Sequence, residues 1–186
     1  MPVNVRPTKA DKVVARIIAR NTTPATEQTA EALTWGADEH TLCAAAAIWW
    51  LYCRGRPATE RAASNHVLIT TVAATILPHL MKHIFTQERP DRRSVEAHLH
   101  GAPFSGRPLQ SFPSGHAVHV GALASAASQL PTTQRALAWT AGTVLVLTRV
   151  FLLAHWASDV AAGLALGAAL ERIIRLFTGF GYRRDA

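Results

Sequence analysis

The sequence predicts an all-α protein: a multi-pass membrane helical bundle of about five transmembrane helices, preceded by an N-terminal amphipathic helix. Hydrophobic residues make up 49% of the 186 positions and charged residues only 17%, below the roughly 25% typical of soluble domains. The apolar residues gather in five segments with aromatic or basic residues at their ends. A buried soluble helical bundle is the alternative, but these flanks favour membrane spans.

The net charge of +7 and the isoelectric point near 10.4 raise the possibility of nucleic-acid binding. The basic residues, however, lie at the edges of apolar segments and are not interleaved with aromatic side chains. This arrangement predicts no nucleic-acid partner. It is typical of charges that flank a bilayer and of a phosphate pocket.

The first 40 residues are expected to form an interfacial segment. Residues 10–20 have helical periodicity, with an apolar face and a basic face. The apolar face holds Val13, Val14, Ile17 and Ile18, and the basic face holds Lys12, Arg16 and Arg20. This pattern predicts a helix on the membrane surface, or an ordinary amphipathic helix. Residues 21–32 are expected to be a polar connection.

A membrane domain is predicted over residues 41–178, followed by a basic tail at 179–186. Its spans are residues 41–53, 66–85, 114–130, 135 to about 150, and 155–177. The first is shorter than the roughly 20 residues that a span needs. The last carries Gly163 and Gly167, a spacing that permits close helix packing in lipid. Residues 89–113 form a long loop without periodicity, as functional loops often do.

A tight turn opens the third span at Pro113-Ser114-Gly115-His116. Its backbone N–H groups and the positive end of the following helix dipole are suited to an anion. His116 lies in the first helical turn, close enough to act on that anion.

Charged and polar residues also close or open the other spans. Lys82 and Arg89 follow the second span, Arg149 closes the fourth, and His155 and Asp159 open the fifth. Charges inside a bilayer cost about 2.5–3.5 kcal/mol each, so those retained at span ends usually have a task. Because consecutive spans are antiparallel, all of these places meet on one side of the bilayer. The three cations could bind phosphate, and helical register would let Asp159 orient the His155 imidazole.

In order along the chain, these residues read Lys82-x6-Arg89-Pro90, then Pro113-Ser114-Gly115-His116, then Thr148-Arg149-x5-His155-x3-Asp159. This pattern resembles the three-part signature of the type 2 phosphatidate phosphatase superfamily, in its integral-membrane lipid phosphatase branch. The superfamily also includes soluble bacterial acid phosphatases and vanadium haloperoxidases. One position departs from the signature, because Thr148 stands where the family usually has serine; the hydroxyl is kept.

The resemblance implies a metal-independent membrane phosphatase that acts through a phosphohistidine intermediate. His155 would be the nucleophile, Asp159 would hold its tautomer, and His116 would protonate the leaving oxygen and later activate water. The residues that would bind the phosphoryl group are Lys82, Arg89, Ser114, Gly115 and Arg149. No cofactor or metal is expected.

The expected substrate is a lipid phosphate or a polyprenyl (di)phosphate, and the bilayer is the other expected partner. The expected location is a bacterial plasma membrane with the active site facing outward. Two alternatives are a vanadate-dependent peroxidase-like site and a non-catalytic membrane protein that binds or transports anions. Five further histidines are expected to face lipid headgroups; they are His79, His83, His98, His100 and His119.

Overall fold

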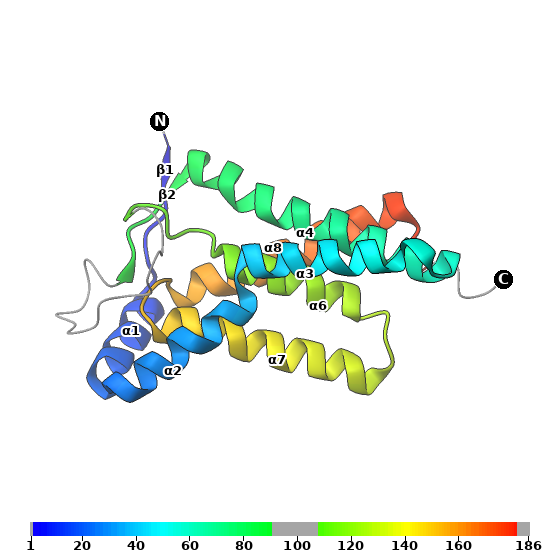
Figure 1. Ribbon diagram of the computed structural model, residues 1–186. Coiled ribbons are helices and arrows are strands. Elements are labelled where there is room, and N and C mark those ends of the chain that lie inside the picture. The colour runs from blue at the N-terminus through cyan, green and yellow to red at the C-terminus, as the bar shows by residue number, and fades with distance from the viewer. Residues whose placement is uncertain (1, 91–107, 182–186) are drawn as a thin grey trace.

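A computed structural model describes residues 2–90 and 108–181 of the chain (Figure 1). His98, His100 and most of the predicted loop at 89–113 lie outside these residues. The described part is a bundle of helices with a short pair of strands near one end. In Figure 1, that end also carries the first two helices, while the longer helices run side by side away from it.

The N-terminal part contains β1 (Val3–Asn4), α1 (Lys9–Asn21), α2 (Pro24–Thr34) and the 3-10 turn η1 (Trp35–Ala37). Thr8 and Asp11 form a reciprocal capping box at the start of α1. The polar connection predicted at 21–32 is wrong, because most of it is α2. Thr23 caps that helix and Pro24 occupies its first turn, where a missing N–H has no cost.

The helix predicted at 10–20 is confirmed as α1, but its apolar face is divided. Ala15, Ile18 and Ala19 pack inward against Leu153 and Trp156. Val13 and Ile17 stay exposed, at 47% and 56% of their surface, on the outer side of the helix. The inward face is therefore rotated from the one that the periodicity suggested, because small alanines fit closest to the neighbouring loop.

The bundle continues through α3 (Glu39–Tyr52), the 3-10 turn η2 (Cys53–Gly55), α4 (Ala58–Ile84), β2 (Phe85–Thr86), α6 (Gly115–Ala127), α7 (Thr132–Phe151) and α8 (Ala157–Thr178). Among the described helices, α4 alone is long and apolar enough to cross a membrane by length and composition. α3 and α6 have 14 and 13 residues, so each is about 20 Å long, against about 30 Å of bilayer hydrocarbon. The count of five spans therefore stays a prediction.

α6 lies in the middle of the bundle and packs most closely on α8. The close approach predicted from Gly163 and Gly167 is confirmed. A Cβ at Gly167 would lie 2.0 Å from the Val118 carbonyl oxygen, and a Cβ at Gly163 would lie 2.7 Å from the Ser114 carbonyl oxygen. Glycine at these positions lets the backbones of α6 and α8 touch, as small residues do in membrane helix pairs.

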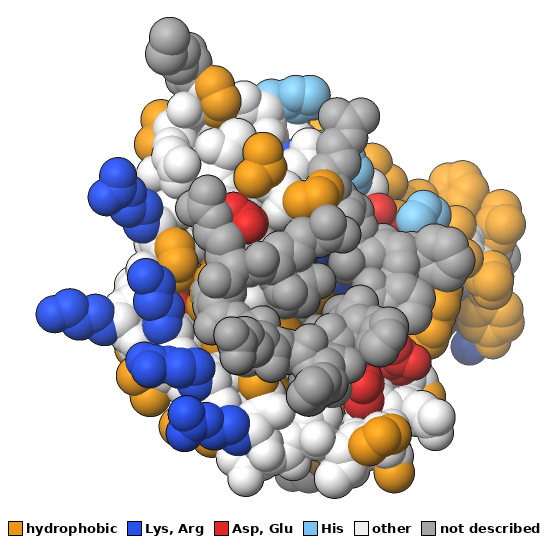
Figure 2. All heavy atoms as spheres, turned by 90° about the vertical axis from the view of Figure 1, so that its left-hand side faces the viewer, with side chains coloured by type: hydrophobic (Ala, Val, Ile, Leu, Met, Phe, Trp, Pro, Cys, Tyr) orange, Lys and Arg blue, Asp and Glu red, His pale blue; other side chains and the backbone are white. Residues whose placement is uncertain are grey.

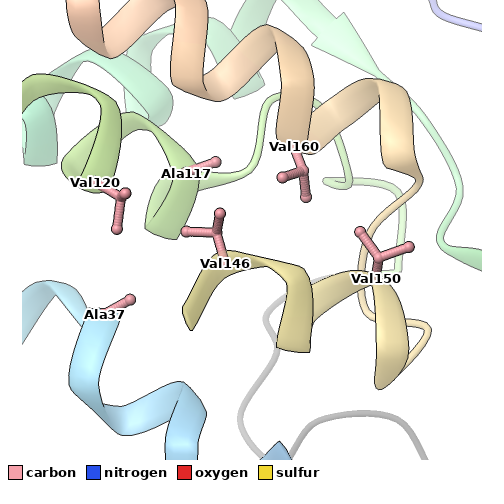
Figure 3. Close-up of a cluster of buried hydrophobic side chains, with 6 residues drawn as sticks. All are labelled: Ala37, Ala117, Val120, Val146, Val150 and Val160. Atoms are coloured by element: carbon pink, nitrogen blue, oxygen red, sulfur yellow. The ribbon is translucent and has the colours of Figure 1, made fainter. Parts of the chain in front are cut away.

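One buried cluster joins η1, α6, α7 and α8 (Figure 3). Ala117, Val150 and Val160 are three of its members, and each follows a predicted site residue directly in the sequence. Packing of this cluster thus fixes the ends of three helices relative to one another, and with them His116, Arg149 and Asp159.

Candidate active site

The segment that carries Arg89 is held beside the segment that precedes the Pro113–His116 turn. β2 pairs in parallel with β1, and Gln87 forms a bridge with Gln110. The Arg89 N–H donates to the Pro108 carbonyl oxygen at 3.3 Å, and the Ser111 N–H donates to the Gln87 carbonyl oxygen at 3.0 Å. These backbone hydrogen bonds bring two distant parts of the sequence motif together.

Arg89 is buried and reaches across to the loop between α7 and α8. Its Nη1 donates to the Ala154 carbonyl oxygen at 2.6 Å and lies 3.5 Å from His155 Nε2. Its Nη2 donates to the Gln110 carbonyl oxygen at 3.3 Å. Arg89 therefore connects the loop that carries His155 with the segment before the turn.

The loop from Leu152 to Trp156 places His155 by a sharp change of chain direction. Leu153 has φ of 51°, in the left-handed region that a non-glycine residue rarely adopts. The N–H groups of Ala154 and His155 both donate to the Arg149 carbonyl oxygen. Leu153 is fully buried against α1, so packing holds a conformation that would otherwise be unfavourable.

Within this loop, His155 has a defined orientation. Its Nδ1 lies 2.7 Å from the Ser111 carbonyl oxygen, and a carbonyl can only accept, so Nδ1 carries the proton. Nε2 is then unprotonated and faces Arg89. Burial lowers the pKa of His155 well below its usual value, and nearby cations lower it further; these are Arg89, Arg149 and Lys82. A neutral imidazole with a free Nε2 lone pair is the form that a nucleophile requires.

Asp159 is close to His155 but does not bind it directly. The Asp159 Oδ2 atom is 3.7 Å from His155 Nδ1; it accepts hydrogen bonds from Ser111 Oγ at 2.5 Å and from the Trp156 N–H at 3.0 Å. The helical register expected from the four-residue spacing is wrong, because α8 begins at Ala157 and His155 precedes it. Asp159 instead accepts a hydrogen bond from the Ser111 hydroxyl, and the Ser111 carbonyl oxygen accepts the hydrogen bond from His155 Nδ1.

The turn at the start of α6 lies next to these residues. The Ser114 N–H donates to the Asp159 carbonyl oxygen at 3.3 Å. Ser114 Oγ and Arg149 Nε are buried and have no hydrogen-bond partner among the described residues. Buried donors normally have partners, so both are suited to an anion bound at the positive end of α6. Lys82, in the last turn of α4, adds a third cation near His155.

His116 and Arg149 border a pocket with a volume of about 350 Å³. Arg149 Nη1 donates to Thr34 Oγ1 at 3.2 Å, which ties the cation to the end of α2. Sequence reasoning missed Ser111 and Thr34 as site residues. Ser111 stands only three residues before Ser114 and could have been considered, whereas nothing in the sequence links Thr34 to Arg149, 115 positions away.

Two further polar residues singled out in the sequence, His119 and Thr148, have defined surroundings in the structure. His119 does not face lipid headgroups, because it is fully buried between α4 and α6, with Nε2 3.1 Å from Thr75 Oγ1. The Thr148 hydroxyl, the one departure from the sequence signature, donates to the Leu145 carbonyl oxygen in its own helix. In the described part of the chain, no three His, Cys, Asp or Glu side chains gather into a group that could hold a metal ion.

Residues 63–182 match the PAP2 superfamily. The chain belongs to this superfamily. The matched range contains every residue of the three-part signature. It excludes α1, α2 and η1, so Thr34 and the pocket wall that it belongs to lie outside the family match.

Relatives of known activity include two lipid A 1-phosphatases. The protein from Rhizobium johnstonii is 38% identical over 104 residues, which cover 55% of this chain and 43% of the relative. The protein from Rhizobium etli is 37% identical over 103 residues, or 55% of this chain and 44% of the relative. The match thus spans less than half the length of either relative.

Two crystal structures share the fold of this PAP2 protein. One is LpxE of Aquifex aeolicus, with a TM-score of 0.66 and 17% identity over 90% of this chain and 95% of that one. The other is a transmembrane PAP2-type phosphatidylglycerolphosphate phosphatase of Bacillus subtilis, with a TM-score of 0.65 and 18% identity over 95% of this chain and 88% of that one.

Proposed function

We propose that this chain is a membrane lipid phosphatase that hydrolyses a phosphate monoester through a phosphohistidine intermediate. One observation carries the proposal. The Nδ1 proton of His155 is bound by the Ser111 carbonyl oxygen at 2.7 Å, while Nε2 faces Arg89 at 3.5 Å. The imidazole is thereby held with its lone pair directed to the place where the cations would bind a phosphoryl group.

The reaction has two steps. His155 Nε2 attacks phosphorus, the N–P bond forms and the P–O bond to the lipid breaks, and His116 protonates the departing oxygen. His116 then takes a proton from water, which attacks phosphorus, breaks the N–P bond and releases inorganic phosphate. Phosphoryl transfer depends mainly on positioning and charge stabilisation. Lys82, Arg89 and Arg149 would stabilise the phosphoryl oxygens, so no metal ion is required.

The outer surface supports a membrane location. Large apolar side chains point outward from four helices: Ile48 and Leu51 of α3, Ile69, Val72, Ile76 and Leu80 of α4, Leu137, Val144 and Leu147 of α7, and Ile173, Leu176 and Phe177 of α8. So many exposed large apolar side chains are unusual on a soluble monomer. Lipid contact accounts for it.

At the active-site end, Lys and Arg side chains gather along one edge (Figure 2). α1 contributes exposed Lys12, Arg16 and Arg20 beside the exposed Val13 and Ile17. This combination suits a helix at the membrane surface. We propose that α1 lies at the lipid headgroups and that the active site opens there, on the outer face of a bacterial plasma membrane.

The substrate class follows from the location and from the relatives. A pocket at headgroup level favours a lipid phosphate, and the two Rhizobium relatives act on the 1-phosphate of lipid A. A lipid 1-phosphate of that kind is therefore the first candidate. Phosphatidate, phosphatidylglycerol phosphate and undecaprenyl diphosphate are the others.

The test is phosphate release by the purified protein in detergent, with these four substrates and with nitrophenyl phosphate. Release should continue in excess EDTA, and vanadate, which mimics the trigonal-bipyramidal phosphoryl group, should inhibit it. Activity that is lost with EDTA and restored by Mg²⁺ would contradict the metal-independent mechanism. No release from any substrate would favour an anion-binding or transport protein.

Acid-quench trapping of labelled phosphoenzyme distinguishes the proposed roles of His155 and His116. His155→Ala should form none. His116→Ala should still form phosphoenzyme from nitrophenyl phosphate, whose leaving group needs no proton, but should lose about 10²–10⁴-fold with a lipid phosphate. Phosphoenzyme in His155→Ala would refute the assigned roles.

A further inference from the structure

The proposed general acid of this site stands among positive charges. Arg149 of α7 and Lys82 of α4 both oppose a positive charge on the His116 imidazole. Within the part of the chain that the structure describes, His116 makes no hydrogen bond or ion pair that would hold its proton. A general acid must carry a proton when it acts. An anionic side chain close to His116 would therefore serve the proposed reaction.

Asp38 brings a carboxylate to the same pocket, because it lines the pocket together with His116 and Arg149. The packing beneath the pocket explains this placement. Ala37 and Ala117 belong to one buried cluster (Figure 3); Asp38 directly follows Ala37, and His116 directly precedes Ala117. The cluster thus holds the turn that carries Asp38 against the start of α6.

The Asp38 side chain is ionised at neutral pH. Burial raises the pKa of Asp38, but hydrogen bonds from the N–H groups of Thr41 and His40 outweigh it and lower that pKa. The side chain is only 18% exposed, so solvent screens its charge incompletely. The Coulomb interaction between Asp38 and His116 favours the protonated imidazole.

Asp38 differs in charge from the other groups around His116. The charged and titratable side chains that interact most strongly with His116 are Arg149, Asp38, His119, Lys82 and His155. Asp38 alone in this set is an anion. Glu31 of α2 also lines the pocket, but it does not belong to the set. His40 lies 3.5 Å from Asp38 and is 87% exposed, so solvent screens its effect on the carboxylate.

The negative charge at position 38 is not explained by helix capping or by phosphate binding. Asp38 is the N-cap of α3, and asparagine caps a helix about as well as aspartate. A carboxylate repels the phosphoryl group that Arg149 would attract. Asp38 also lies outside residues 63–182, the range that matches the superfamily. The charge therefore calls for a role of its own in this chain.

We propose that Asp38 is a positioning residue that keeps the catalytic proton on His116. It acts across the pocket through its charge and does not touch the reacting atoms. In the first step the proton passes from His116 to the leaving oxygen as the P–O bond breaks, while Asp38 stays ionised. The proposal rests on the proposed phosphatase function and adds a residue to the same site.

The test is Asp38→Asn, which removes the charge and keeps the cap. Single-turnover phosphoenzyme formation is followed against pH with a lipid phosphate, whose leaving group needs a proton, and with nitrophenyl phosphate, whose leaving group does not. For the lipid phosphate, the alkaline limb of the pH profile should move about one unit to lower pH, and the rate above that limb should fall about tenfold. The sign follows because a general acid is active only while it is protonated.

Two further readouts separate this role from a structural one. The rate with nitrophenyl phosphate should be unchanged, and inhibition by vanadate should be as strong as in the wild type or stronger, because a repelling charge is gone. The ratio of the two rates in one preparation does not depend on the fraction of folded protein. Asp38→Glu keeps the charge and should recover part of the loss.

Glu31→Gln is the matched control, because it makes the same charge change in the same pocket. Its ratio of the two rates should stay within twofold of wild type. An unmoved alkaline limb in Asp38→Asn, or an equal effect in Glu31→Gln, would overturn the proposal. Equal losses with both substrates and weaker vanadate inhibition would also overturn it, because Asp38 would then act on Arg149. Absence of phosphoenzyme in the wild type with either substrate would instead refute the phosphatase mechanism itself.

Discussion

Replacing Ser111 by alanine should reduce turnover without weakening phosphate binding. Ser111 is fully buried; its carbonyl oxygen accepts the His155 Nδ1 proton and its Oγ donates to Asp159 Oδ2. The alanine variant keeps the carbonyl but loses the bond that fixes it. Because the three cations are untouched, KM should change little, and the loss should fall on kcat.

The magnitude follows from the contact that is removed. The Oγ to Oδ2 distance is 2.5 Å, and the acceptor is a carboxylate at a fully buried residue. A hydrogen bond to a charged group contributes about 1.5–3 kcal/mol. If the whole of this free energy serves to align His155, its loss raises the activation free energy by the same amount. The kcat then falls by about tenfold to a hundredfold, since 1.36 kcal/mol corresponds to a factor of ten.

A matched control lies further along the bundle. Ser125 Oγ donates to the buried Glu171 Oε2 at 2.6 Å. Ser125 lies nine residues beyond His116 on α6, about 14 Å away along the helix axis. Ser125→Ala removes the same kind of bond and should lower the thermal unfolding temperature similarly. It should leave kcat per folded molecule unchanged.

The assay is single-turnover phosphoenzyme formation together with steady-state kinetics, both normalised to folded protein. Ser111→Thr keeps the hydroxyl and should recover part of the loss. A kcat in Ser111→Ala within twofold of wild type would refute the reasoning, as would an equal fall in Ser125→Ala.

Asp11→Asn should lower the stability of the detergent-solubilised protein by about 2 kcal/mol, because the Asp11 carboxylate binds both the N–H and the hydroxyl of Ser158 at the start of α8; thermal unfolding measures it. Burial raises the pKa of Asp11, but hydrogen bonds from Ser158 and Thr8 outweigh it and lower that pKa below 3.8. The stabilisation by Asp11 is therefore complete above pH 3.8 and is lost as pH falls through the lowered pKa. A difference in stability between Asp11→Asn and wild type that persists well below this pH range would contradict the assignment. Gly167→Ala should separate α6 from α8, since its Cβ would meet the Val118 carbonyl oxygen at 2.0 Å; a large fall in unfolding temperature is expected, whereas Gly55→Ala, with open space around its Cβ, should have no such effect.

Much of the architecture could be predicted from the sequence, because it depends on local patterns. Apolar periodicity located most of the helices, and Gly163 and Gly167 predicted the contact of α8 with α6, since only glycine allows backbones so near. The order and spacing of the polar residues also indicated the superfamily. The segment wrongly predicted to be a connection is α2, a mostly polar helix. Hydrophobic periodicity gives no signal for such a helix.

What the tertiary structure decided is which atoms meet. A four-residue spacing places two side chains on one face only inside a helix, and His155 lies in the loop before α8 begins. The sharp turn at Leu153 directs the His155 imidazole to Ser111 instead of Asp159. The contact of Thr34 with Arg149 joins segments 115 residues apart. The sequence by itself determined the local conformations of most helices, because short-range forces control them. The hydrogen-bond partners of His155 and the wall of the pocket depend on long-range packing, which only the fold specifies.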